Sequence, residues 1–140
     1  MKSSKKELQK SIDNFKKPIL VELDSFNIEC KISGRSKHYN SIHEKMVKQR
    51  KEFSEIFDFL ALRIIVGKIE ECYAVLGIVH QMYTPIQERF KDFIATPKIN
   101  GYQSIHTTVF GKAGKMFEVQ IRTKEMDKTA EIGVAAHWAY

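Results

Sequence analysis

Residues 104–123, SIHTTVFGKAGKMFEVQIRT, have the pattern of two β-strands joined by a short turn. In residues 104–110 and 115–123, β-branched and aromatic residues alternate with polar ones, which predicts two strands. The linking residues 111–114, GKAG, supply the glycines that tight turns favour. The segment therefore predicts a β-hairpin, and we expect its second strand near the centre of a sheet.

The second strand of this hairpin separates polar from apolar side chains. Side chains alternate between the two faces of a strand, so three polar residues come to share one face. Met116, Glu118, Gln120 and Arg122 fall on one face, and Phe117, Val119 and Ile121 fall on the other. Glu118 is a candidate metal ligand or general base for a hydroxyl. A solvent-exposed polar face fits the same pattern, and these residues alone leave both interpretations open.

The stretch before the hairpin, residues 89–103, reads RFKDFIATPKINGYQ and is too irregular for ordinary core. Pro97 cannot donate to a sheet ladder, and Asn100-Gly101 favours a tight turn because both residues tolerate positive φ. The turn brings Tyr102 close to other polar side chains. These neighbours are Lys98, Asn100 and His106. A flat ring beside cations predicts a site for a flat, anionic ligand, such as a nucleotide.

Residues 57–66, FDFLALRIIV, belong to the most apolar part of the chain and predict a strand buried on both faces. A charge in such a strand is costly unless it is paired or bound to metal. Asp58 suits Mg²⁺, which takes one or two carboxylates together with phosphate oxygens. Arg63 can stack on a ring or bind a phosphate through two donors. An internal Asp58–Arg63 ion pair is the structural alternative.

A second anion site is predicted near the start of the chain. Residues 28–33 alternate apolar and polar and predict a strand, which ends in a turn at Gly34-Arg35. Ser41 and Glu44 form a capping-box pattern, so a helix is expected to begin there. Backbone N–H groups at that helix start and three cations could hold a phosphate chain. The cations are Arg35, Lys37 and Lys45. No P-loop pattern is present, and a solvated basic turn is the alternative.

The remaining segments predict helices. Residues 1–26 are rich in lysine and have apolar residues at helical spacing, with a kink or restart expected at Pro18. Residues 67–83 and 124–140 have broad apolar helical faces. The order of elements predicts an α+β domain that spans residues 1–140, with a mixed sheet of about five strands and helices packed around it.

The composition limits the class of protein. The chain has 140 residues, of which 43% are hydrophobic, enough for one domain with a core. Its formal net charge of +6 suits a polyanionic partner but does not choose between nucleotide, nucleic acid and membrane surface. No apolar run approaches the ~20 residues of a membrane span. Cys30 and Cys72 lack zinc-site spacing, so we expect reduced thiols in a cytoplasmic protein.

Six ordered motifs resemble the synthetase domain of the RelA/SpoT family, whose members make the alarmones ppGpp and pppGpp. They are GRSKHYNSIHEKM (34–46), DFLALRIIV (58–66), YAVLGIVH (73–80), RFKD (89–92), PKINGYQSIHTTV (97–109), and EVQIRT (118–123) with AAHWAY (135–140). The resemblance covers roughly residues 25–140 and implies a nucleotidyltransferase fold of the polymerase-β type. Residues 1–25 resemble the helix that precedes this domain, and residues 26–140 the nucleotide-binding core.

The resemblance implies the reaction and its residues. The family transfers pyrophosphate from ATP to the ribose 3′-hydroxyl of GDP or GTP and releases AMP, with Mg²⁺ as cofactor. The implied ATP-binding residues are Arg35, Lys37, Ser41, Lys45 and Arg63, the two arginines lying on opposite faces of adenine. The implied guanosine-nucleotide residues are Tyr102, which stacks on guanine, and Lys98, Asn100, His106, Arg89 and Lys91. The implied metal ligands and catalytic residues are Asp58 and Glu118, and Glu118 activates the hydroxyl.

The RFKD motif resembles the form found in bifunctional family members, which also hydrolyse the alarmone. No His-Asp dipeptide of the hydrolase domain occurs in the chain, so we expect a fragment of a longer protein whose other domains or ribosome association regulate it. We expect no membrane partner and no direct nucleic-acid binding. The alternatives are a catalytically silent nucleotide-binding module and a basic RNA-binding domain.

Overall fold

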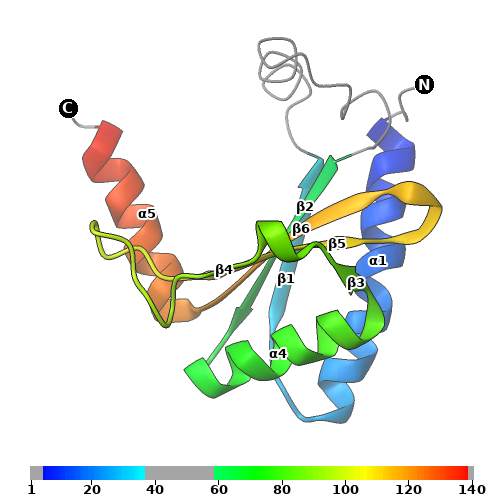
Figure 1. Ribbon diagram of the computed structural model, residues 1–140, viewed down its shortest axis with the longest axis horizontal. Helices are drawn as coiled ribbons and strands as arrows, with labels where there is room; N and C mark the ends of the chain where they lie inside the picture. The colour runs from blue at the N-terminus through cyan, green and yellow to red at the C-terminus, as the bar shows by residue number, and fades with distance from the viewer. Residues whose placement is uncertain (1–4, 37–58, 139–140) are drawn as a thin grey trace.

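The computed structural model describes residues 5–36 and 59–138. Its helices in these ranges are α1 (Lys5–Ser25), α4 (Ile69–Met82) and α5 (Lys124–Trp138). Its strands are β1 (Lys31–Ser36), β2 (Phe59–Val66), β3 (Thr84–Pro85), β4 (Lys91–Asp92), β5 (Ile105–Phe110) and β6 (Met116–Thr123). Two short 3₁₀ helices are η1 (Gln87–Arg89) and η2 (Lys112–Gly114). The predicted α+β class is confirmed (Figure 1).

One mixed sheet contains all six of these strands, in the order β1-β2-β6-β5-β3, and β4 also pairs with β5. The two long inner strands, β2 and β6, run parallel, whereas every other pair is antiparallel. The hairpin of β5 and β6 and the central place of β6 are confirmed. The strand count exceeds the expected five because β3 and β4 are two-residue strands that pairing with β5 creates.

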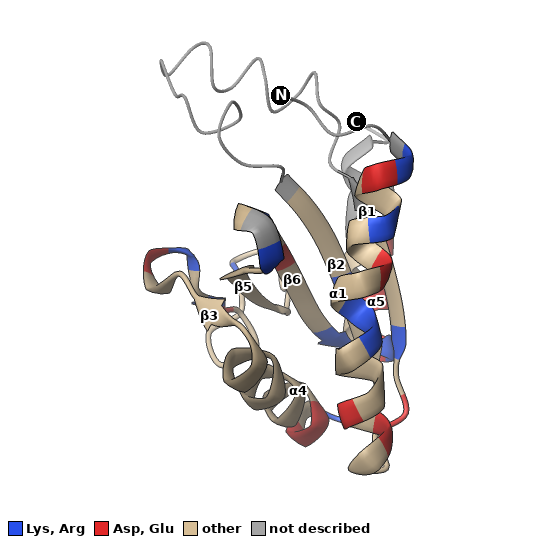
Figure 2. Ribbon diagram, turned by 90° about the vertical axis from the view of Figure 1, so that its right-hand side faces the viewer, with Lys and Arg blue, Asp and Glu red and all other residues tan. Residues whose placement is uncertain are grey.

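Helices α1 and α4 cover the apolar face of the sheet. The core includes Ile12 and Ile19 of α1, Val75 of α4, and Leu62 and Val119 of the central strands, all at most 2% exposed. Burying each such side chain fully contributes about 1.5–3 kcal/mol. Lys, Asp and Glu positions recur along α1 (Figure 2), and among them Asp13, Lys17 and Glu22 are exposed. The helix continues through Pro18 without restarting.

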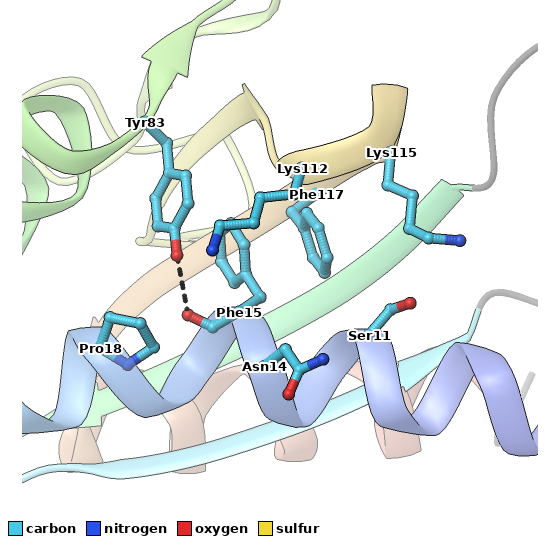
Figure 3. Close-up of a pocket in the computed structure, with 8 residues that line it drawn as sticks. All are labelled: Ser11, Asn14, Phe15, Pro18, Tyr83, Lys112, Lys115 and Phe117. Carbon is cyan, nitrogen blue, oxygen red and sulfur yellow. Dashed lines mark hydrogen bonds between the residues drawn. The ribbon is translucent and has the colours of Figure 1, made fainter.

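Three aromatic rings join α1 to the end of α4 and to β6 (Figure 3). Phe15 stacks on Tyr83 with ring centroids 4.3 Å apart and on Phe117 with centroids 3.7 Å apart. The Tyr83 hydroxyl donates a hydrogen bond of 3.1 Å to the Phe15 carbonyl oxygen. A pocket of about 210 Å³ lies over these rings, beside Lys112 and Lys115. This packing fixes α1 on the face of the sheet that α4 also covers.

The predicted turn at Gly34-Arg35 is wrong, because both residues lie inside β1 and pair with β2. Gly34 is required by packing: a Cβ there would lie 2.6 Å from Ile12 Cγ2 of α1. The prediction that β2 is buried on both faces is also wrong. Its alternate residues Ala61, Arg63 and Ile65 are only partly buried, because α1 and α4 cover one face.

Both cysteines are free thiols. Cys72 of α4 is fully buried in the core, and burial, with the nearby carboxylates of Glu71 and Asp92, raises the pKa of its thiol to about 11. Cys30 is half-buried, and burial also raises the pKa of its thiol. Among the described helices, none combines the length and apolar character that crossing a membrane requires.

Candidate functional site

A row of polar residues crosses the sheet on the face opposite α1 and α4. Lys91 of β4 pairs with His106 of β5, His106 with Gln120 of β6, Gln120 with Arg63 of β2, and Arg63 with Ser33 of β1. Residues paired directly across strands point to the same side of a sheet. Three residues that were predicted for two different nucleotides, Lys91, His106 and Arg63, are therefore brought onto one surface.

Glu118 lies on the same face, two residues from Gln120 along β6. Its register partners are Thr108 of β5 and Ala61 of β2, and Ala61 in turn lies opposite the backbone of Arg35 in β1. A cavity of about 300 Å³ opens above these strands. It is lined by Ser33, Gly34, Ala61, Leu62, Arg63, Glu118 and Gln120. A carboxylate, an amide and a guanidinium thus share one hollow of polar character.

Tyr102 stands at the β5 side of the polar row. Its backbone N–H donates to Asn100 Oδ1 over 3.0 Å, and Gly101 has a φ of +85°, which confirms the tight turn. The Tyr102 hydroxyl is hydrogen-bonded to His106 Nε2 over 2.8 Å. The ring is half-buried, and the Lys98 ammonium lies 5.6 Å from its centroid. The turn therefore presents an aromatic ring, a cation and an amide side by side.

Arg122 is the buried cation of this face, with only 3% of its area exposed. Its Cζ lies 5.8 Å from the centroid of the Tyr102 ring. Asp127 Oδ1 of α5 lies 3.4 Å from Arg122 Nε and 3.5 Å from Arg63 Nη1. Burial lowers the pKa of Arg122 and the Arg63 charge lowers it further, whereas Tyr102 and Asp127 oppose this change. One carboxylate therefore joins the two arginines.

The RFKD motif is divided between two tasks. Arg89 Nε donates to Thr108 Oγ1 over 3.2 Å, which places Arg89 next to the register partner of Glu118. Asp92 instead braces the loop: it accepts hydrogen bonds from the Tyr73 hydroxyl at 2.8 Å and from the backbone N–H groups of residues 94 and 95 at 2.9 Å. Arg89 and Lys91 thus lie beside the strand β5 residues Thr108 and His106, whereas Asp92 holds the loop that follows it.

Several predicted residues lie outside the described ranges. They are Lys37, Ser41, Lys45 and Asp58, and only the backbone position of Arg35 is described. The alternative Asp58–Arg63 ion pair is therefore not tested, although Arg63 pairs with Asp127. Sequence reasoning gave Arg122 no role beyond the polar face and did not single out Asp127. An acid in the first turn of a helix is common, so Asp127 carried no signal of its own.

Residues 34–140 match the family model described as a region found in RelA/SpoT proteins. The chain belongs to the RelA/SpoT family. It is 51% identical over 144 residues to a guanosine-3′,5′-bis(diphosphate) 3′-pyrophosphohydrolase of Spiroplasma citri. That alignment covers 100% of this chain and 19% of the Spiroplasma protein. The chain is 47% identical to a GTP pyrophosphokinase of Escherichia coli K12, which covers 92% of this chain and 17% of that protein. The chain thus spans less than about a fifth of the length of these RelA/SpoT relatives.

Solved structures of alarmone synthetases and of GTP pyrophosphokinase family proteins have the same fold. The small alarmone synthetase 2 of Bacillus subtilis superposes with a TM-score of 0.76 at 27% identity, over 94% of this chain and 77% of that one. A GTP pyrophosphokinase family protein of Streptococcus pneumoniae superposes with a TM-score of 0.69 at 25% identity, over 96% of this chain and 73% of that one. The predicted synthetase fold is confirmed.

Proposed function

We propose that this RelA/SpoT-family chain is a GTP pyrophosphokinase, which transfers the pyrophosphoryl group of ATP to the 3′-hydroxyl of GDP or GTP and leaves AMP. The observation that supports this most is the register that aligns His106, Gln120 and Arg63 across the sheet, beside Glu118 and the cavity. Relatives named GTP pyrophosphokinase at 47% and 48% identity support the same reaction.

In this proposal the two nucleotides occupy opposite ends of the polar row. Guanine stacks on the half-buried Tyr102 ring, with Lys98 and Asn100 at its edge. Adenine lies between Arg63 and Arg35, because a guanidinium plane stacks well on a ring. Phosphoryl transfer depends mainly on positioning and charge neutralisation, and two fixed bases supply the positioning.

Glu118 is the proposed base. It takes the proton of the 3′-hydroxyl while the bond from that oxygen to the β-phosphorus of ATP forms and the bond from the β-phosphorus to the α–β bridging oxygen breaks. AMP leaves with the electron pair of the broken bond. Arg89, held by a hydrogen bond to Thr108, the register partner of Glu118, is placed to neutralise charge on the phosphates.

Mg²⁺ fits the residues of this site. The described part of the chain offers no group of three or more His, Cys, Asp or Glu residues for a metal ion. Mg²⁺ commonly binds through only one or two carboxylates and takes its other ligands from phosphates and water. Glu118, on the cavity wall, and Asp58 are the proposed carboxylates. When bound, Mg²⁺ supplies neutralisation of the phosphate charge.

The test is an assay of the whole chain with labelled ATP, GDP or GTP, and Mg²⁺. The expected result is labelled guanosine tetra- or pentaphosphate together with AMP. Nucleotide binding without product supports a silent binding module instead. Loss of label from added guanosine tetraphosphate as pyrophosphate supports the hydrolase activity named for the Spiroplasma relative.

A further inference from the structure

Gln120 occupies the middle of the polar row. Its register partners are His106 on one side and Arg63 on the other, and it lines the cavity together with Glu118. If the proposed function holds, Gln120 lies between the guanosine end and the adenosine end of the site. Its side chain is half-buried and so can reach a ligand in the cavity.

A hydrogen bond from Arg122 fixes the orientation of the Gln120 amide. Arg122 Nη2 donates a hydrogen bond of 3.0 Å to Gln120 Oε1. A guanidinium carries only donors, so it must meet the oxygen of the amide and not the nitrogen. The Gln120 amide nitrogen, with two N–H donors, is therefore turned away from Arg122. The structure gives this nitrogen no hydrogen-bond partner among residues 5–36 and 59–138.

Arg122 cannot contact a ligand in the cavity directly, because only 3% of it is exposed. Its Nε and Asp127 Oδ1 lie 3.4 Å apart without forming an aligned hydrogen bond, so Coulomb attraction holds the pair. Replacing a buried ion pair by apolar residues is often neutral or stabilising, so such pairs are weak evidence for stability. The arrangement suits a positioning task, in which Asp127 holds Arg122 and Arg122 holds Gln120.

We propose that Gln120 is a nucleotide-binding residue that donates its amide N–H to a ribose or phosphate oxygen in the cavity, and that Arg122 and Asp127 are its positioning residues. This proposal rests on the proposed function of the site. Ribose hydroxyls and phosphate oxygens both accept hydrogen bonds. A neutral donor beside Glu118 binds such an oxygen without forming an ion pair with the proposed base.

The deciding variant is Gln120→Glu, which keeps the shape and the acceptor for Arg122 but replaces the donor by a charged oxygen. Titrations with a non-hydrolysable ATP analogue and, separately, with GDP are expected to show at least about a tenfold loss of affinity for one of them, since a hydrogen bond is lost and repulsion is added. The ligand that weakens identifies the source of the oxygen. Gln81→Glu, at an exposed position of α4, is the control with the same charge change.

The positioning role has its own readout. Arg122→Lys keeps the charge but loses the planar fork, so we expect a smaller loss for the same ligand as in Gln120→Glu, and none for the other. If Gln120→Glu unfolds, Gln120→Asn replaces it, because the amide is kept but withdrawn from the cavity. Equal affinities of the Gln120 variants and the control for both ligands overturn the inference. If Gln120→Glu loses affinity as expected but the parent chain makes no product, the proposed function is refuted and the inference about Gln120 stands.

Discussion

The Tyr102 hydroxyl and His106 Nε2 lie 2.8 Å apart, within hydrogen-bond distance. This contact ties the irregular turn at residues 97–102 to β5, and through β5 to the polar row of the sheet. The Tyr102 ring is therefore held in place before any ligand arrives, with its plane nearly perpendicular, at 87°, to that of His106.

Tyr102→Ala is expected to weaken GDP binding by roughly 5- to 100-fold, because stacking of a base on an aromatic ring contributes about 1–3 kcal/mol. Affinity for an ATP analogue should stay within about twofold, since loss of the ring leaves Arg63 in place. Isothermal titration measures both. Tyr102→Phe is the matched control, because it keeps the ring and removes only the bond to His106. An unchanged GDP affinity in Tyr102→Ala would contradict guanine stacking at this residue.

Glu118→Gln should lower kcat by about 10²- to 10⁴-fold, the usual contribution of a general base. Binding of the ATP analogue should persist, because the cavity keeps its shape. Single-turnover product formation measures the first effect and titration the second. Glu131→Gln, at an exposed position of α5, is the control. Full synthesis by Glu118→Gln would rule out the proposed role of this carboxylate.

Gly34→Ala should destabilise the fold by about 1–3 kcal/mol, because the added Cβ meets Ile12 Cγ2 at 2.6 Å and the core has no room for it. Gly77→Ala is the opposite case. Nothing lies within 4 Å of a Cβ at this position inside α4, so the change should stabilise by about 0.5–1 kcal/mol. Urea unfolding at constant m-value measures both. Equal stabilities of the two variants would show that α1 does not press on Gly34.

His80 gives a pH prediction. Its Nε2 is hydrogen-bonded to Thr107 Oγ1 over 2.7 Å, and burial lowers the pKa of its imidazole. As pH falls below about 6.5, the His80 imidazole is therefore protonated in the unfolded state before it is protonated in the folded state. Stability should fall as pH drops from about 6.5 toward the lowered pKa of the folded state. His80→Gln should reduce this slope, as measured by the free energy of unfolding between pH 7.5 and 5.5. A slope equal to that of the parent chain would show that another group causes it.

The hairpin and the polar face of β6 were predictable because alternation is a local property of the chain. The same alternation placed Glu118, and it named Gln120 and Arg122 without indicating a task. The parallel pairing of β2 with β6 was not predictable, since it joins strands that are distant in sequence. Gly34 was misread as a turn because glycine serves both turns and close packing, and only the approach of Ile12 distinguishes the two.

For the candidate site too, only features that depend on neighbouring residues were predictable from the sequence. The Tyr102 turn followed from Asn100-Gly101, a dipeptide with strong local preferences. The shared carboxylate of Asp127 depends on where α5 docks after β6, and no pattern of residue types reports that. Positions that act through a neighbour are thus harder to find from sequence than positions that carry the chemistry themselves.

The parallel pairing of β2 with β6 also determines when the cavity forms during folding. Helices can form early from neighbouring residues, but this contact closes a long loop and is slow to assemble. The hollow floor exists only once both strands have met. A nucleotide that occupies it therefore selects fully folded chains, and ligand-dependent protection of β2 amides from hydrogen exchange would report the completion of folding.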